Sequence, residues 1–255
     1  MVKSVNDFQI IDNKRLNNDF FVLELYSGLA LNQISPGQFV QVRIDDSPET
    51  FLRRPFSVHD VNYKANTIKL LVQIAGKGTY SLSLKRKGDI LNLVYPLGNS
   101  FSLPPEDEKT LLIGGGCGVA PLLYLAKYLK SNNCSFDILM GFRNKDRIIE
   151  YDEYRKLSKV YLTTEDGSDG EKGFVTQHSI LAQKVFPRIY CCGPESMMKA
   201  VAGYSIENKI YCEVSLENLM ACGIGVCLCC VVNTTGGNVC SCTEGPVFNV
   251  NKLKW

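Results

Sequence analysis

The sequence predicts a multi-domain β plus α/β protein: an antiparallel β-barrel, a doubly wound parallel sheet and a small C-terminal module rich in cysteine. Three observations predict this class. Short strands follow one another closely over residues 1–102, strands alternate with helices over residues 103–212, and six of the 11 cysteines fall within residues 213–255. These patterns are typical of a barrel, of a parallel sheet covered by helices and of a metal-binding module, respectively.

Composition and charge narrow the class of protein. The chain has 255 residues, 45% of them hydrophobic and 21% charged, with a formal net charge of +2 from mixed signs, so we expect no nucleic-acid partner. The longest apolar stretch, residues 111–126, is too short and too rich in glycine to span a membrane, and we expect no membrane association. Residues 1–13 lack the apolar core of a signal peptide, and an odd number of cysteines argues against a disulfide framework, so we expect a cytoplasmic protein.

The barrel is predicted from three runs rich in aromatic and β-branched residues. These runs are residues 20–25, 38–44 and 67–74, and turns are expected at residues 35–37 and 87–89. Several short strands with such spacing favour a small antiparallel barrel. Prolines at positions 96, 104 and 105 place its end near residue 102.

The parallel sheet is predicted from four short apolar runs. Strands are expected at residues 109–113, 135–140, 159–163 and 188–192, and the first is followed by a helical stretch over residues 120–130. Strand–helix alternation of this kind implies a doubly wound sheet, whose ligands bind at the carboxyl ends of the strands.

A glycine loop follows the first of these strands. It reads Gly114-Gly-Gly116-Cys-Gly118-Val-Ala-Pro121, with the pattern G-x-G-x-x-P from Gly116 to Pro121. Glycines let the backbone turn tightly and approach a pyrophosphate, and the helix that follows offers free N–H groups. The setting favours a dinucleotide site over a simple tight turn, and proline is compatible with the first turn of a helix.

Two further segments are expected at the same edge of the sheet. Cys192-Gly193-Pro194 ends the last predicted strand, so its thiol lines a nicotinamide pocket or is a structural thiol before a turn. Glu165 and Asp166 follow the third strand. These carboxylates suit a ribose and repel a 2′-phosphate, which favours NAD over NADP; a solvated loop is the alternative.

Within the barrel, two segments are candidates for binding a flavin. Arg54-Pro55-Phe56-Ser57 places a guanidinium, a ring and a hydroxyl close together on one strand, although an Arg-Arg pair is usually a solvated surface pair. Gly76-Lys-Gly78-Thr79, followed by a helix-like stretch, is a candidate phosphate cradle. His59 is interpreted as an ordinary strand residue.

The cysteine module carries the most specific pattern. Cys222, Cys227 and Cys230 have the C-x4-C-x2-C spacing of plant-type [2Fe–2S] proteins, and Cys240 or Cys242 follows as the fourth candidate. Zinc is the alternative, but zinc sites usually have two C-x2-C units. Glycines 223 and 225 suit a loop whose backbone approaches the cluster. The cysteines left over, of which Cys229 is one, are interpreted as buried small hydrophobes.

Taken in this order, the motifs resemble those of the ferredoxin–NADP reductase superfamily. Its flavin barrel carries R-x-[YF]-S, which here is Arg54 to Ser57, and its nucleotide domain carries G-x-G-x-x-P and C-G-P, which here are Gly116 to Pro121 and Cys192 to Pro194. Residues 220–227 and 242–248 narrow the resemblance to the electron-transfer subunits of heterotetrameric dihydroorotate dehydrogenase B. The resemblance covers nearly the whole chain.

The resemblance implies FAD in the barrel of residues 1–102, NAD as co-substrate in residues 103–212 and a [2Fe–2S] cluster in residues 213–255. It implies electron flow from dihydroorotate, through FMN on a catalytic partner subunit, to the cluster, to FAD and to NAD+, in pyrimidine biosynthesis. The choice of Cys242 over Cys240 rests on this resemblance. The implied site comprises Cys192 as the catalytic residue; Arg54, Pro55, Phe56, Ser57, Gly76, Gly78 and Thr79 at FAD; Gly114, Gly116, Gly118 and Pro121 at NAD; and Cys222, Cys227, Cys230 and Cys242 as metal ligands.

Two other functions stay open at this point. One keeps the cofactors and changes the partner, as in the related reductase subunits of ferredoxin:NADP+ reductase, sulfide dehydrogenase or hydrogenase complexes. A cysteine at position 222 favours dihydroorotate dehydrogenase over the first two, in which this ligand often varies. The other is a zinc-stapled interaction module without redox activity.

Overall fold

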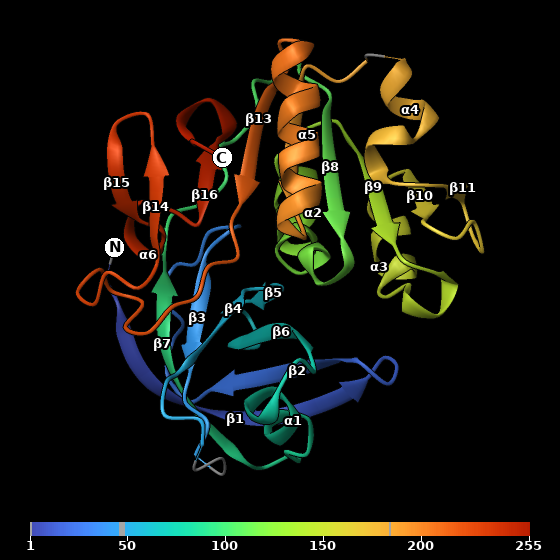
Figure 1. Cartoon of the computed structure of the whole chain (residues 1–255). Coiled ribbons are helices and arrows are strands. Elements are labelled where there is room, and N and C mark those ends of the chain that lie inside the picture. Colours follow the sequence, from blue (N-terminus) through green and yellow to red (C-terminus); the bar gives the residue numbers. More distant parts are fainter. Residues whose placement is uncertain (1, 46–48, 184) are drawn as a thin grey trace.

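The computed structural model describes residues 2–45, 49–183 and 185–255, and Figure 1 shows how these are arranged. A curled antiparallel sheet lies at the bottom of the view, a second sheet with helices on both sides lies at the upper right, and a small hairpin with the C-terminus lies at the upper left. Within these ranges no helix is long and apolar enough to cross a membrane.

The first sheet is the predicted barrel. Its strand order is β4-β3-β7-β1-β2-β6-β5, and every neighbouring pair is antiparallel. The strands at the two edges, β4 and β5, are separated in sequence only by Val58 and His59, so the sheet must curl until its edges meet. The elements are β1 (Ser4–Arg15), β2 (Phe20–Ser27), β3 (Phe39–Val42), β4 (Arg54–Ser57), β5 (Asp60–Asn62), β6 (Thr67–Gln73), α1 (Lys77–Ser83) and β7 (Ile90–Leu97).

Alternation of side chains fills the barrel. Phe8 and Ile10 of β1, Val40 and Val42 of β3 and Leu93 of β7 point inward and are fully buried. In a strand, successive side chains point to opposite faces, so Phe39 and Gln41 of β3 point outward. They are nevertheless buried, because the cysteine module covers this outer face.

The second sheet has the order β11-β10-β9-β8-β12-β13-β16, and its first six strands are parallel. This confirms the predicted doubly wound sheet. Its elements are β8 (Thr110–Gly115), η1 (Gly116–Val119), α2 (Ala120–Ser131), β9 (Phe136–Phe142), η2 (Lys145–Arg147), α3 (Tyr151–Arg155), β10 (Val160–Thr164), β11 (Glu171–Lys172), η3 (Val175–Gln177), α4 (Ser179–Ala182), β12 (Arg188–Cys192), α5 (Glu195–Glu207) and β13 (Tyr211–Ser215).

Helices cover both faces of this sheet. Leu112 of β8 packs with α2 and α3 on one face, whereas Leu111 and Ile113 pack with α4 and α5 on the other. The sheet is therefore buried on both faces, as parallel sheets usually are. All four strands predicted for this region are present, and the predicted helix at residues 120–130 is α2.

The C-terminal segment contacts both sheets. It contains β14 (Val231–Thr234), β15 (Gly237–Cys240), α6 (Ser241–Glu244), β16 (Val247–Asn249) and η4 (Val250–Lys252). Strand β16 pairs antiparallel with β13 and so becomes the edge of the second sheet. Met220, Cys230 and Cys242 pack against Phe39 and Leu97 on the outside of the barrel. This segment has few apolar residues of its own, and it buries them by packing against the two larger sheets.

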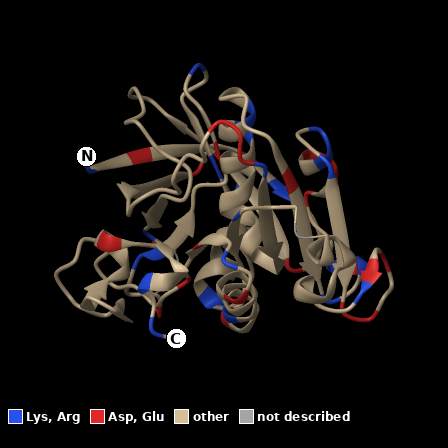
Figure 2. Ribbon diagram, turned by 90° about the horizontal axis from the view of Figure 1, so that it is seen from above, with Lys and Arg blue, Asp and Glu red and all other residues tan. Residues whose placement is uncertain are grey.

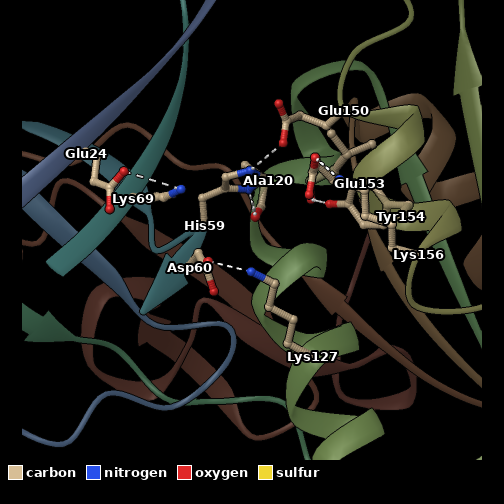
Figure 3. Close-up of polar contacts among 11 residues, drawn as sticks. Glu24, His59, Asp60, Lys69, Ala120, Lys127, Glu150, Glu153, Tyr154 and Lys156 are labelled. Carbon is tan, nitrogen blue, oxygen red and sulfur yellow. Dashed lines mark hydrogen bonds and ion pairs between the residues drawn. The ribbon is translucent and has the colours of Figure 1, made fainter. Parts of the chain in front are cut away.

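Polar side chains link the barrel to α2. His59 lies between β4 and β5 rather than within a strand, and it is 1% exposed. Its Nδ1 is 2.8 Å from the carbonyl oxygen of Ala120, its Nε2 is 3.5 Å from Glu150, and Asp60 pairs with Lys127 at 2.5 Å, as Figure 3 shows. His59 thus contacts the first residue of α2, and Asp60 contacts a later turn of the same helix.

Candidate functional site

A cavity of about 610 Å³ lies at the carboxyl edge of the second sheet. This is the edge at which open α/β sheets bind their ligands. The loops after β8, β9, β10 and β12 form its walls, and two barrel side chains close one side. The lining includes Phe20, Gln73, Gly115, Gly116, Cys117, Gly118, Phe142, Arg143, Arg147, Glu165, Gly193, Pro194 and Glu217.

The glycine loop divides its residues between binding and packing. Gly116 has φ +53° and open space where a Cβ would stand, so its backbone is bare toward the cavity. At Gly118 a Cβ would lie 2.3 Å from the carbonyl oxygen of Cys192, so only glycine allows the loop to touch the end of β12. Gly114 and Pro121 are buried and do not line the cavity.

Two thiols lie at this edge, at different depths. Cys117 lines the cavity, and burial raises its pKa to about 12. Cys192 is fully buried, is absent from the cavity lining, and burial raises its pKa well above the ordinary value. Both shifts favour the neutral thiol over the reactive thiolate. The expected contact of Cys192 with the nicotinamide ring stays a prediction.

Glu217 was missed by the sequence analysis. Its side chain is exposed at the cavity, and desolvation by the protein atoms around its carboxyl raises the pKa of that group. Its charge also raises the pKa values of Cys117 and Cys192, so the three groups lie together. The available signal was its isolation, because residues 218–243 contain no other charged side chain.

The predicted ribose segment after β10 is only partly at the cavity. Glu165 lines it, whereas Asp166 turns back and accepts hydrogen bonds from the backbone and hydroxyl of Ser168. Arg143 and Arg147, which the sequence analysis did not select, also line the cavity. Arg147 is paired with Asp19 of the barrel at 2.8 Å.

The two arginines of the flavin segment have different roles. Arg53 donates to the carbonyl of Asn92 at 2.8 Å and to its side-chain oxygen at 2.5 Å, which ties it to β7. The guanidinium of Arg54 donates only to the nearby carbonyl of Leu52 among the hydrogen bonds of the described residues, so most of its donors are free for a phosphate. Pro55, Phe56 and Ser57 continue β4 and are half-buried.

The second flavin segment forms a tight turn at the start of α1. Thr79 accepts hydrogen bonds from the N–H groups of Ala75 and Gly76 at 2.9 and 3.1 Å. A Cβ at Gly78 would lie 3.0 Å from the methyl group of Thr50, whereas Gly76 has open space around it. Gly76 therefore leaves a bare backbone at the surface, and Gly78 serves close packing.

The loop from Cys222 to Cys230, called the cysteine loop below, directs backbone N–H groups at one sulfur. The N–H groups of Ile224, Val226 and Cys227 donate to Cys222 Sγ at 3.4, 3.3 and 3.4 Å. Burial raises the pKa of Cys222, but these hydrogen bonds outweigh it and bring the pKa down to about 6. A thiolate held by backbone N–H groups is the donor expected around an iron–sulfur cluster, so this loop fits that group.

Glycine permits this loop. Gly223 and Gly225 have φ of +70° and +85°, and a Cβ at Gly225 would lie 2.9 Å from Thr243. Cys230 and Cys242 lie beneath the loop, where burial and the neighbouring Cys230 thiol raise the pKa of Cys242 to about 12. The described residues contain no group of three or more His, Cys, Asp or Glu side chains already placed to hold a metal ion, but the thiol of Cys222 also lies close enough to that of Cys242 to raise its pKa.

The two remaining cysteines of the module are not buried. Cys229 is exposed and Cys240 is partly exposed, so the interpretation of both as buried hydrophobes is wrong. The reason is that residues 226–229 are exposed one after another, and that Cys240 ends β15, a strand whose side chains are exposed or half-buried.

Comparison with known proteins identifies the class. Residues 112–203 match the oxidoreductase NAD-binding domain, and residues 217–254 match the iron–sulfur cluster binding domain of dihydroorotate dehydrogenase B. The solved structure of an NADH-dependent reduced ferredoxin-NADP oxidoreductase superposes with a TM-score of 0.87 at 31% identity, covering 99% of this chain and 90% of that chain. A ferredoxin reductase of carbazole 1,9a-dioxygenase, at 19% identity and a TM-score of 0.71, shares the fold, with 82% of this chain and 67% of that chain covered. The protein is an oxidoreductase subunit of the ferredoxin reductase type.

Curated relatives give the family. The electron transfer subunit of dihydroorotate dehydrogenase B (NAD(+)) from Caldanaerobacter subterraneus subsp. tengcongensis is 39% identical over 246 residues, which is 94% of each chain. The subunit of the same name from Fusobacterium nucleatum is 34% identical over 96% of each chain. The chain belongs to the family of dihydroorotate dehydrogenase B electron transfer subunits.

Proposed function

We propose that this chain carries electrons from dihydroorotate oxidation, on an FMN-containing catalytic subunit, through a [2Fe–2S] cluster and FAD to NAD+. The observation that carries the proposal is the cysteine loop, in which three backbone N–H groups point at Cys222 Sγ in the same chain as a dinucleotide cavity. When bound, the cluster supplies one-electron transfer and the flavin supplies the exchange between single electrons and a hydride.

The residues that would hold these groups follow from their surroundings. Cys222, Cys227, Cys230 and Cys242 would ligate the cluster, because the first three lie on or beside the loop and Cys242 packs with Cys230 on the barrel. Arg54 has free donors for the flavin phosphates, and Gly116 leaves a bare backbone for the NAD pyrophosphate. Glu217 and Cys117 would lie beside the nicotinamide ring, with Cys192 behind them.

The surface around the cysteine loop supports a protein partner. Leu219, Val226 and Leu228 are 86%, 76% and 63% exposed, and residues 218–243 carry no charge. Elsewhere, Figure 2 shows Lys and Arg interspersed with Asp and Glu over the molecule. An uncharged apolar surface beside a redox centre suits docking of another subunit. We therefore infer that the catalytic subunit docks here, within a heterotetramer.

The eleven cysteines, all free, are consistent with a reducing compartment, and we propose a cytoplasmic location.

A second candidate function keeps the cofactors and replaces the partner. The likeness to an NADH-dependent reduced ferredoxin-NADP oxidoreductase favours this second function. Arg143 and Arg147 favour it too, because they line the cavity near the expected ribose position, where a guanidinium suits the 2′-phosphate of NADP.

Native co-purification tests the proposal. The complex is isolated from source cells and assayed for dihydroorotate-dependent reduction of NAD+ and of NADP+. The proposal expects an FMN-containing partner and reduction of NAD+. A different redox partner without a response to dihydroorotate overturns the pathway assignment, and a colourless chain with stoichiometric zinc overturns the redox function itself.

A further inference from the structure

The side chain of Gln41 is buried without a hydrogen bond. It is 0% exposed, and neither its amide nitrogen nor its amide oxygen has a partner among the described residues. An unpaired buried amide costs about 1–3 kcal/mol, so a folded protein rarely keeps one without a use.

Gln38, three residues earlier, shows the ordinary solution. It is 1% exposed, its oxygen accepts from the N–H of Ser35 at 2.7 Å, and its nitrogen donates to the carbonyl of Gly98 at 2.8 Å. The two glutamines share the same part of the fold, so the lack of partners at Gln41 is specific to its position.

Gln41 lies directly under the cysteine loop. It is on the outer face of β3, and its register partner on β7 is Val94, which packs with Met220, Cys230 and Cys242. A Cβ placed at Gly223, the residue after Cys222, would lie 2.9 Å from Gln41 Cγ and 3.1 Å from Nε2. The amide therefore faces the backbone that carries the first cysteine.

We infer that the Gln41 side-chain amide donates a hydrogen bond to a sulfur of the [2Fe–2S] cluster, and so raises the reduction potential of the cluster. This inference rests on the proposed cluster-binding function. Sulfur atoms of a cluster are the acceptors that this loop would bring to the amide, and an N–H donor stabilises the reduced, more negative form. Gln41 would thus be a barrel residue that contacts the cluster directly and tunes its reduction potential.

The test is a redox titration of the full, cofactor-loaded chain, followed by electron paramagnetic resonance of the reduced cluster. Gln41→Met keeps the size of the side chain and removes the donor. Loss of one hydrogen bond to a charged acceptor should lower the ratio of reduced to oxidised cluster about tenfold at a fixed potential, which is about 59 mV for one electron.

Thr110→Val is the matched control. The Thr110 hydroxyl is also 0% exposed and unpartnered among the described residues, but it lies at the start of β8 in the second sheet. Both variants should leave the cluster-free protein at least as stable as the wild type, since each removes an unpaired buried polar group. Only Gln41→Met should shift the potential.

If the wild type gives the paramagnetic resonance signal of a reduced cluster, and Gln41→Met has the same reduction potential as the wild type, the role of Gln41 is overturned and the proposed function stays intact. A wild-type chain that never gives the signal overturns both. If Gln41→Met does not fold, the wild type labelled with 15N in its glutamine side chains decides the matter. A hyperfine coupling between a glutamine amide nitrogen and the reduced cluster supports the inference, and its absence overturns it.

Discussion

The glycine loop after β8 and the cysteine loop after β13 both present backbone N–H groups, but different parts of the protein hold them. Gly118 packs directly against Cys192, and Val119 and Ala120, at the start of α2, are buried in the core. In the cysteine loop, Val226 and Leu228 are largely exposed. Hydrophobic packing therefore holds the glycine loop in place, whereas we expect the cysteine loop to gain much of its order from the group it binds.

The thiols of the two regions differ in the same way. Burial raises the pKa values of Cys117 and Cys192, whereas backbone N–H groups lower that of Cys222. The same type of side chain is thus a buried thiol at the nucleotide cavity and is held by N–H groups on the barrel surface. The surroundings of a cysteine decide its chemistry more than the spacing of cysteines along the sequence does.

The largest effect should come from the ligand cysteines. Replacing Cys222, Cys227, Cys230 or Cys242 singly with Ala should abolish the cluster, because a two-iron centre needs four thiolates. Iron and sulfide content and the visible spectrum measure this. Cys229→Ala, in the same loop but outside the C-x4-C-x2-C spacing, is the control and should keep the cluster. Retention of a full cluster in Cys242→Ala together with its loss in Cys240→Ala would reassign the fourth ligand.

The next largest effect should be at Gly118. A methyl group there would lie 2.3 Å from the carbonyl oxygen of Cys192, so Gly118→Ala must push β12 and the loop apart. Overpacking of this kind costs about 1–3 kcal/mol. The free energy of unfolding measured in urea should fall, and the affinity for NADH should decrease. Gly203→Ala in α5, where a Cβ meets nothing within 4 Å, should instead stabilise the protein by up to about 1 kcal/mol. Normal NADH binding in Gly118→Ala would show that the loop is not held by this contact.

Local patterns explain what the sequence could predict. The runs at residues 67–74 and 188–192 became β6 and β12, and the glycine and cysteine loops were found by spacing alone. These signals are contained within a few neighbouring residues. The expected barrel, parallel sheet and cysteine module were all present, and membership in the reductase family is confirmed.

Long-range pairing explains what it could not. Nothing in the residues around Gln41 indicates that the cysteine loop, some 180 positions later, lies over it. Glu217 and Arg143 enter the cavity only because β13 and β9 end at one edge of the sheet. Similarly, β16 completes the second sheet by pairing with β13, which the apolar pattern of residues 247–249 does not specify.

Glu217 should make NAD+ binding depend on pH. Desolvation raises the pKa of its carboxyl, so the group is neutral below that pKa and charged above it. The charged form attracts the cationic ring of NAD+, and NAD+ affinity should therefore rise about tenfold as pH increases through this pKa. NADH, with its neutral ring, should bind almost equally throughout. Glu217→Gln should abolish the rise, and Glu207→Gln, at the end of α5, should leave it unchanged. Calorimetric titration at several pH values measures both ligands. Equal pH dependence for NAD+ and NADH would remove Glu217 from the ring.

The smallest effect should come from the ion pair between the barrel and α2. Lys127 is 41% exposed at its side chain and pairs with Asp60 at 2.5 Å. Figure 3 shows the two side chains pointing toward each other. Because solvent screens such a pair, Lys127→Met should cost less than about 1 kcal/mol in urea unfolding, and less still at high salt. NADH affinity should not change, since packing holds the glycine loop at the other end of this helix. Lys199→Met, which breaks the pair with Glu195 inside α5, is the matched control and should behave alike. A larger loss in Lys127→Met, accompanied by weaker NADH binding, would mean that charge rather than packing fixes the glycine loop, and the contrast with the cysteine loop would fail.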